Sequence, residues 1–151
     1  MNETDKQQAI DILNRIMELE LAGVVRYTHY ALMVFGYARI PIVSWLKGNG
    51  DESLTHAQKA GELVTLLGGH PSLKIGALLE THKHDIGDIL RESLEQEQST
   101  LDAYYELLTL ATGKSVLLEE YARDMIALEE MHADEVNKML RKPGEIEKFK
   151  E

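Results

Sequence analysis

The spacing of apolar residues predicts that this chain is built from long α-helices. In the first segment, Leu13, Met17, Val24 and Tyr27 recur at intervals that match one face of a helix. The same periodicity continues in three later segments, whereas the alternation typical of strands is hard to find. We therefore expect an all-α fold with helices over residues of about 5–35, 41–67, 85–111 and 115–142.

Residues with special backbone preferences mark the ends of these predicted helices. Asn2 or Thr4 suits the N-cap of the first helix, and Ser115 suits the N-cap of the fourth. Pro41 fits the first turn of the second helix, and the glycine pair at 68–69 fits its C-terminal end. The boundaries are therefore supported by local signals as well as by periodicity.

The lengths of the connections predict how the helices are arranged. The first and third connections are short, so each joins two helices into an antiparallel hairpin. The middle connection, from Gly68 to about His84, is long enough to carry the chain along a four-helix bundle. We expect one domain over residues 1–151, with a short charged tail. Inside the second helix, Gly48 and Gly50 cost about 1 kcal/mol each relative to alanine, which predicts a bend or two shorter helices.

The composition narrows the classes of function. The chain contains no cysteine, which excludes disulfides, thiolate metal sites and cysteine nucleophiles and fits a reducing cytoplasm. A formal net charge of −10 repels nucleic acid and attracts cations. The N-terminus lacks a signal-peptide pattern, and no apolar run reaches the roughly 18 residues of a membrane span. We therefore expect a cytoplasmic protein without nucleic-acid or membrane partners.

Two glutamates interrupt apolar helical faces. Glu20 lies on the apolar stripe of the first helix, and Glu97 lies on that of the third. The apolar neighbours of Glu97 at helical spacing are Leu90, Leu94, Leu101 and Tyr104. A buried carboxylate without a partner is unfavourable, so it becomes protonated or binds a cation. A metal ion is one such partner, so both glutamates are candidate metal ligands.

The second and fourth helices each add an acid and a histidine. Glu129 and His132 are three residues apart and share one helical face, whereas Glu52 precedes His56 by four residues. Bundles that hold two iron or manganese ions use one glutamate from each of two helices and Glu-x-x-His from each of the other two. The sequence matches this pattern on the fourth helix and in altered form on the second. Such ligands suit iron or manganese, and zinc also binds to them.

On these residues the sequence resembles bacterioferritin, within the ferritin-like superfamily, from about Ile12 to Leu140. The matching stretches are Glu20-Leu21, Arg26-Tyr27, His56-Ala57, Leu94-Glu95-Gln96-Glu97, Arg123-Asp124-Met125 and Glu129-Glu130-Met131-His132. The resemblance implies a ferritin-like four-helix bundle with a non-haem di-iron site. The ligands that it implies are Glu20 and Glu97, one per iron, the bridging Glu129, and the histidines His56 and His132. It also implies a place beside the iron for Tyr27, our candidate catalytic residue.

The sequence departs from the family pattern in the second helix. With His56 aligned, Ser53 stands at the position of a bridging glutamate, and serine is a poor iron ligand. Glu52 lies one residue earlier, about 100° around a regular helix. It reaches the metal if a π-bulge distorts the helix there, and it then completes the set of candidate ligands. Without that distortion, the site has only one bridging carboxylate.

Two further departures concern haem and assembly. Leu54 stands where the family has the methionine that binds haem between two subunits, so we expect no haem of that kind. The tail is shorter than the fifth helix that lines an axis of the 24-subunit cage in that family. We therefore expect a homo-oligomer of at least two copies, with a dimer favoured over a cage.

The leading hypothesis is a ferroxidase in which Fe²⁺ binds among these ligands and O₂ or peroxide accepts the electrons. Ser53 motivates an alternative, a metal-binding or structural dimer without ferroxidase activity. The two hypotheses differ in metal content, with about two irons per chain against one metal ion or none. An oxidase of organic substrates is a third hypothesis, and it requires a pocket beside the metals.

The remaining histidines fall outside this pattern. His29 lies on the opposite side of the first helix from Glu20, so we expect it at the surface or in a subunit interface. His70, His82 and His84 belong to or adjoin the long connection. We favour solvated side chains there over a secondary metal site.

Overall fold

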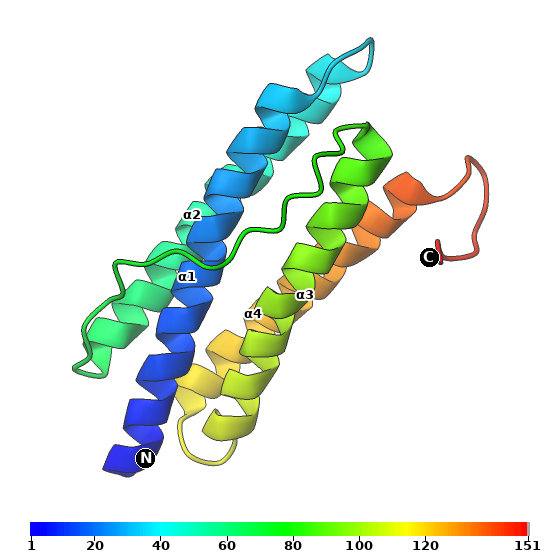
Figure 1. The fold of residues 1–151 in the computed structure, drawn as a ribbon. Coiled ribbons are helices and arrows are strands. Elements are labelled where there is room, and N and C mark those ends of the chain that lie inside the picture. The colour runs from blue at the N-terminus through cyan, green and yellow to red at the C-terminus, as the bar shows by residue number, and fades with distance from the viewer. Residues whose placement is uncertain (151) are drawn as a thin grey trace.

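Four α-helices form two antiparallel hairpins that pack into a bundle (Figure 1). The computed structural model describes residues 1–150. The helices are α1 (Glu3–Met33), α2 (Arg39–Leu66), α3 (Ile86–Ala111) and α4 (Val116–Leu140). No strand occurs in the described residues, and each helix end lies within two residues of its predicted position. The predicted all-α, ferritin-like arrangement of two hairpins and one long crossover is therefore confirmed.

Local interactions set the helix ends. The Asn2 side chain accepts a 2.8 Å hydrogen bond from the backbone N–H of Asp5, and Ser115 accepts one of 3.3 Å from Leu118. Gly68 follows α2 with a φ of 83°, in the left-handed region that glycine adopts readily. The caps predicted at Asn2 and Ser115 are therefore confirmed, as is the glycine signal at the end of α2.

The glycine-containing stretch of α2 remains helical. α2 continues without a break through residues 48–50, so the alternative of two shorter helices is wrong. Asn49 is buried, and a Cβ atom at Gly50 would lie 3.5 Å from the Cβ of Tyr27 in α1. Close packing against α1 therefore compensates for the low helix propensity of glycine in this stretch.

The apolar core has two parts. One part includes Leu13, Ile16 and Leu107, and the other includes Tyr30 and Leu46. In α1, α2 and α3, the acids and histidines predicted as ligands fall between members of the two parts. A polar layer therefore crosses the middle of the bundle, and its charges must be paired because it is buried.

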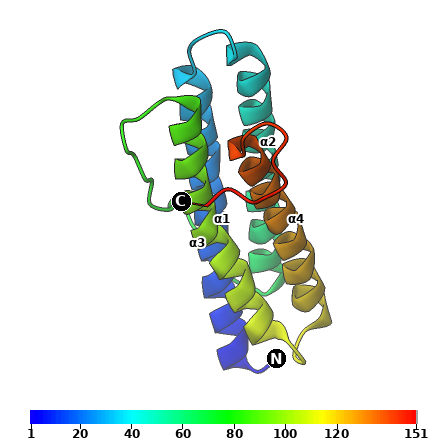
Figure 2. The same ribbon diagram turned by 90° about the vertical axis from the view of Figure 1, so that its right-hand side faces the viewer.

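The crossover, residues 67–85, runs along α1 toward the start of α3 (Figures 1 and 2). Its first half is bound to α1, where the Asn14 side chain accepts a 2.9 Å hydrogen bond from the N–H of Ser72. The N–H of Gly76 donates to the carbonyl of Glu18 over 2.8 Å. These backbone contacts give the segment a defined path without regular secondary structure.

The second half of the crossover is bound to α3. The N–H and the hydroxyl of Thr81 donate to one Glu92 oxygen over 2.9 and 2.6 Å. The amide of Gln96 donates to the carbonyl of Ala77 over 3.3 Å. The crossover thus bridges α1 and α3, which holds its side chains in fixed positions beside both helices.

The bundle is wider between α2 and α4 than between its other neighbouring helices. α1 packs against α2 and α3, and α3 packs against α4. Within the described residues, no Cα atom of α2 lies within 8 Å of a Cα atom of α4. This separation leaves room for long polar side chains between the two helices.

The chain ends in a segment that contains no helix up to residue 150. It folds back toward α4 (Figure 2), where the side chain of Asn137 donates to the carbonyl of Phe149 and accepts from its N–H. The tail is therefore attached to the bundle without adding a fifth helix among the described residues. None of the helices in residues 1–150 is long and apolar enough to cross a membrane.

Candidate metal centre

Five potential ligands converge in the polar layer of the bundle, and every helix supplies at least one of them. We call this group the intra-bundle cluster: Glu20 of α1, His56 of α2, Glu97 of α3, and Glu129 and His132 of α4. Glu20 and Glu129 are only 3% and 7% exposed. Helical periodicity thus predicted correctly that the two acids face the interior.

One half of the cluster is centred on His56. Its Nδ1 atom lies 3.6 Å from Glu20 Oε2 and 3.7 Å from Glu129 Oε1. The three side chains offer ligand atoms that all lie within 4.8 Å of one another, a spacing compatible with a shared metal ion. The hydroxyl of Tyr104 donates a 3.2 Å hydrogen bond to the other oxygen of Glu20, which orients its carboxylate.

The other half is centred on Tyr27, which is fully buried. Its hydroxyl donates to Glu97 Oε1 over 2.6 Å and lies 3.1 Å from Nε2 of His132. Arg26 also donates to Glu97 Oε1, over 3.0 Å. The ring of Trp45 stacks on His132 with an interplanar angle of 11°, so packing fixes the imidazole as well. Tyr27 therefore lies between two candidate ligands.

Burial and charge give the acids different proton affinities. Burial raises the pKa of Glu20, and burial together with the charges of Glu97 and Glu20 raises the pKa of Glu129 to about 8. Burial alone would raise the pKa of Glu97 too, but the charge of Arg26, together with hydrogen bonds from Glu129 and Tyr27, lowers that pKa to about 2. The cluster therefore combines one carboxylate that stays ionised with two whose pKa values are raised.

For His56 of α2, the neighbouring charges together outweigh the effect of burial on the pKa. Burial alone would lower the pKa of His56, but the carboxylates of Glu129 and Glu20 raise it to about 10. The imidazolium therefore acts as the positive partner of these acids in the metal-free protein. A metal ion at the same place would replace that proton, because a coordinating imidazole must be neutral.

The α2 side of the site is less complete. Ser53 is buried between α2 and α1, and a Cβ atom at Gly23 would lie only 2.9 Å from its hydroxyl oxygen. Glu52 is exposed and borders the same small pocket as Glu97, Glu129 and His132. α2 is α-helical throughout this stretch and contains no π-turn, so Glu52 lies at the rim of the pocket.

Three contacts of the site were not anticipated from the sequence. Arg26 was noted only as part of a matching stretch, yet its guanidinium is buried against Glu97. Tyr104 was read as an apolar neighbour of Glu97, and its hydroxyl instead binds to Glu20. The sequence did contain a clue to the role of Tyr104, because a tyrosine on the inward face of a helix usually finds a hydrogen-bond partner for its hydroxyl. No local signal indicates that Trp45 stacks on His132.

An all-α bundle that gathers carboxylates and imidazoles from every helix defines the class of four-helix metal-binding carboxylate proteins. The family model described as ferritin, ferritin-like domain, matches residues 10–145. The chain therefore belongs to the ferritin-like family. A search of curated proteins found no match.

Solved structures with the same fold include two kinds of protein. A ferritin-like, diiron-carboxylate protein from Bacillus anthracis is 24% identical with a TM-score of 0.86, over 93% of this chain and 100% of that one. The bacterioferritin of Desulfovibrio desulfuricans is 22% identical with a TM-score of 0.80, over 93% and 82% of the two chains. The bacterioferritin of Rhodobacter capsulatus is 20% identical with a TM-score of 0.80, over 89% and 84%. The resemblance to bacterioferritin and its ferritin-like relatives is thereby confirmed for family and fold.

Proposed function

We propose that this protein binds Fe²⁺ in the intra-bundle cluster and oxidises it with O₂ or peroxide. The observation that carries this proposal is the convergence of Glu20, His56 and Glu129 in one half of the cluster and of Glu97 and His132 in the other. The two halves offer a place for two ions, with Glu129 next to both. The solved structures of diiron-carboxylate proteins with this fold support the same reading.

The donor set fits ferrous iron. Carboxylate oxygens and imidazole nitrogens suit iron, manganese and zinc, and the chain has no thiolate to draw the site toward softer metals. The pKa values of Glu20 and Glu129 stay raised although His56 lies beside both, so the negative charge of the two acids is only partly compensated in the metal-free site. Divalent ions supply that compensation, so binding should release protons from His56 and the acids.

The oxidation requires an acceptor for two electrons. Two ferrous ions lose one electron each, and together these reduce O₂ and two protons to hydrogen peroxide, or one peroxide and two protons to two waters. The protein's own residues hold the ions, exclude bulk water and position Tyr27, whose hydroxyl contacts Glu97 and His132. The Tyr27 hydroxyl can therefore donate a hydrogen bond that stabilises negative charge on the Glu97 carboxylate.

The position of Glu52 makes the two halves of the metal site unequal. We propose that its carboxylate, at the exposed rim of the pocket, binds from the solvent side once an ion is present. Ser53 lines the same pocket, but its neutral hydroxyl does not replace a carboxylate as an iron ligand. The half of the site nearest α2 should therefore bind its ion more weakly than the half built on α4.

Anaerobic titration with Fe²⁺, followed by exposure to O₂, tests this function. We expect about two irons per chain and, on oxidation, a near-ultraviolet absorption band of ferric iron. Absence of that band, with iron bound in the anaerobic phase, would overturn the ferroxidase proposal but leave metal binding intact. Absence of bound iron would overturn both.

A second candidate is a metal-binding protein without ferroxidase activity. The exposed position of Glu52 and the burial of Ser53 favour it, because α2 then provides His56 as its only inward ligand. This candidate predicts one tightly bound divalent ion per chain and no rapid oxidation of Fe²⁺. The titration described above distinguishes it from the first.

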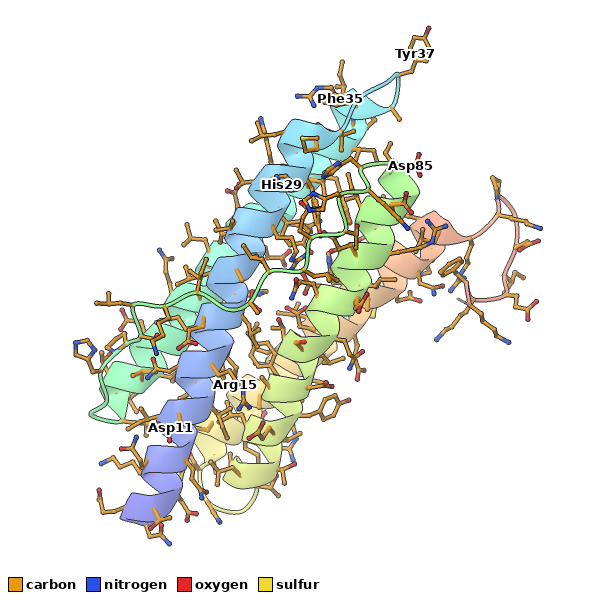
Figure 3. The ribbon with its side chains drawn as sticks, viewed as in Figure 1. Asp11, Arg15, His29, Phe35, Tyr37 and Asp85 are labelled. Carbon is orange, nitrogen blue, oxygen red and sulfur yellow. The ribbon has the colours of Figure 1, made fainter. Side chains whose placement is uncertain are left out.

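We further propose that the protein works as a homo-oligomer of at least two copies, in a reducing cytoplasm. Leu32, Phe35 and Ile40 are 67%, 72% and 84% exposed around the turn between α1 and α2, and Figure 3 shows Phe35 and Tyr37 at this end of the molecule. Large exposed apolar side chains of this kind mark interaction surfaces. Leu54 lines an adjacent groove between α1 and α2, and we propose that this groove takes a second copy without haem.

Sedimentation of the wild-type protein and of Leu32→Lys tests the assembly. The wild type should sediment as a dimer or a larger species, and the variant should shift toward the monomer. A wild-type protein that stays monomeric at micromolar concentration would refute this part of the proposal. Leu73→Lys, which changes a leucine of the crossover that is 96% exposed, is the control.

A further inference from the structure

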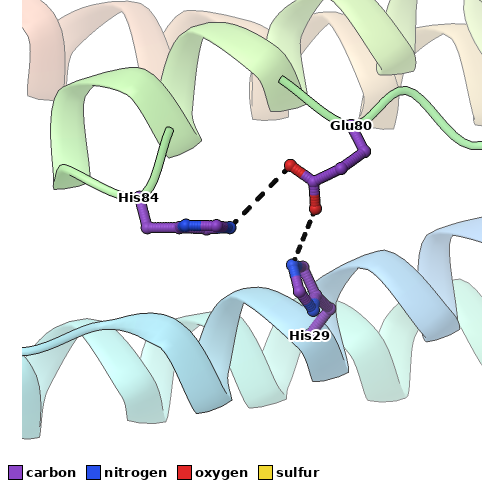
Figure 4. A group of neighbouring side chains, drawn as sticks. All are labelled: His29, Glu80 and His84. Carbon is purple, nitrogen blue, oxygen red and sulfur yellow. Dashed lines mark ion pairs between the residues drawn. The ribbon is translucent and has the colours of Figure 1, made fainter. Parts of the chain in front are cut away.

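A second group of metal-binding side chains lies outside the bundle core. His29 projects from α1 toward the crossover, and Glu80 and His84 of the crossover face it (Figure 4). The sequence placed His29 at the surface or in a subunit interface and favoured a solvated His84 over a secondary metal site, and it gave no reason to bring the two together. We call His29, Glu80 and His84 the crossover cluster.

The three side chains surround a common point. His29 Nε2 lies 3.0 Å from Glu80 Oε2, and His84 Nε2 lies 3.8 Å from Glu80 Oε1. The two imidazole rings meet at 69° with their centroids 5.4 Å apart. One ligand atom from each residue lies within 4.8 Å of the others.

The two histidine nitrogens are also unsatisfied. The Nε2 atoms of His29 and His84 are both inaccessible to solvent, and neither makes a hydrogen bond, although each is close to the carboxylate of Glu80. A buried nitrogen without a partner is unfavourable. Two such nitrogens aimed at one carboxylate are the arrangement expected of a metal site without its ion.

We propose that the crossover cluster binds one divalent transition-metal ion of the zinc or ferrous class. Zinc binds to histidine nitrogen at 2.0–2.1 Å and to carboxylate oxygen at 2.0–2.2 Å, so tetrahedral ligands are about 3.4 Å apart. The observed separations, 3.0 Å from His29 to one Glu80 oxygen and 3.8 Å from His84 to the other, are close to that value. Two imidazoles and one carboxylate favour such an ion over Mg²⁺ or Ca²⁺, which prefer oxygen ligands, and leave a fourth position for water.

The surrounding hydrogen bonds hold the ligands in place before any ion binds. Tyr30, next to His29, donates a 2.6 Å hydrogen bond to Glu92 Oε1. The other Glu92 oxygen accepts two hydrogen bonds from Thr81, next to Glu80. The buried carboxylate of Glu92 therefore links the neighbours of two ligands, which sets their spacing as outer-shell partners do in metal sites.

The position of the cluster suggests what the ion would do. It would join α1 directly to the crossover, close to the start of α3 at Ile86, where the segment otherwise depends on a few hydrogen bonds. His29 is nine residues from Glu20, about 13 Å along the helix and on its other side. This site is thus separate from the intra-bundle cluster, and the inference does not depend on the proposed oxidation of iron.

Zinc stoichiometry tests the proposal. Wild-type protein and the double variant His29→Ala/His84→Ala are dialysed against a low concentration of Zn²⁺, and bound zinc is measured by elemental analysis. We expect the double variant to bind one zinc per chain fewer than the wild type. His70→Ala, which removes an exposed crossover histidine outside the cluster, should bind as much as the wild type.

A second measurement guards against an unfolded variant. Glu80→Gln keeps the size of the side chain and should also lose one zinc per chain, with the helical circular dichroism of the wild type. Zinc should slow hydrogen exchange of the amides of residues 77–85 in the wild type and not in Glu80→Gln. Equal zinc content in the wild type and in both cluster variants, or equal loss in His70→Ala, would overturn the proposal.

Discussion

The intra-bundle cluster and the crossover cluster combine the same two ligand types in opposite settings. In the first, the side chains of Glu20 and Glu129 are 4% and 8% exposed and come from helices locked in the bundle. In the second, the side chains of His29, Glu80 and His84 are 43%, 33% and 23% exposed, and two of them come from an irregular segment. The comparison separates the effect of burial from the effect of ligand chemistry.

Because the intra-bundle cluster is buried, its charged groups need partners of opposite charge. Carboxylates removed from water need compensation, and the metal-free protein provides it with Arg26 and with the proton of His56. The crossover cluster is closer to solvent, because its side chains are 23–43% exposed, although the Nε2 atoms of its two histidines are buried. Changes in the buried cluster should therefore affect both stability and activity, whereas changes in the crossover cluster should act mainly through a bound ion.

The largest effect should follow from Glu129→Gln. This change removes the carboxylate that lies beside both halves of the intra-bundle cluster, so the rate of Fe²⁺ oxidation should fall by at least about 100-fold. Stopped-flow absorbance after mixing with O₂ measures the rate. Glu130→Gln changes the exposed neighbour that binds to Tyr105, and it should oxidise Fe²⁺ like the wild type. Equal rates in the two variants would refute the assignment of Glu129.

Next in size is the effect of Arg26→Met on stability. The Arg26–Glu97 pair is buried, with side chains 4% and 13% exposed, so loss of the arginine leaves a buried charge unpaired. We expect the free energy of unfolding to fall by about 3 kcal/mol in urea denaturation. Arg15→Met breaks an exposed pair with Glu106 and should lower it by less than about 1 kcal/mol. Similar losses in both variants would show that burial is not the deciding factor.

A smaller effect is expected from pH in the metal-free protein. The folded pKa values of Glu129 and His56, about 8 and about 10, lie above the ordinary values, so their stabilisation is complete at low pH and is lost as pH rises through those values. The free energy of unfolding should therefore decrease between about pH 7 and pH 10, by about 2 kcal/mol after allowance for solvent screening.

Urea denaturation at several pH values in the presence of a chelator measures this decrease. Glu129→Gln should show a shallower dependence on pH, because one of the two titrating groups is gone and the other loses a negative partner. The ionised Glu97, with a pKa of about 2, contributes in the opposite sense and only below about pH 4.5. A profile that is flat from pH 7 to 10 would contradict the charge distribution described for this site.

The smallest effect should be that of His84→Ala in metal-free protein. Partly exposed histidine–carboxylate contacts stabilise little, so the melting temperature should change by less than about 3 °C. Adding Zn²⁺ should raise the melting temperature of the wild type more than that of the variant, since a ligand that binds the folded state stabilises it. Differential scanning calorimetry with and without zinc measures both quantities. A large loss of stability without metal would mean that the contact between His84 and Glu80 stabilises the fold by itself, without a bound ion.

The sequence alone determined the helices and much of the intra-bundle cluster. Periodicity of three and four residues is a local property, and it placed Glu20, Glu97 and Glu129 on inward faces. Capping is equally local, so Asn2 and Ser115 were recognised from their own short segments. A long connection between two hairpins then left few arrangements of the bundle.

Only the tertiary structure decided which residues from different helices meet. Arg26 reaches Glu97 across 71 positions of sequence, and no pattern within α1 distinguishes it from a surface arginine. Glu52 lies at the rim because α2 stays regular and packs Ser53 toward Gly23. His29 meets Glu80 and His84 because hydrogen bonds to α1 and α3 fix the path of the crossover. Distances between distant segments depend on packing, and helical periodicity carries no information about them.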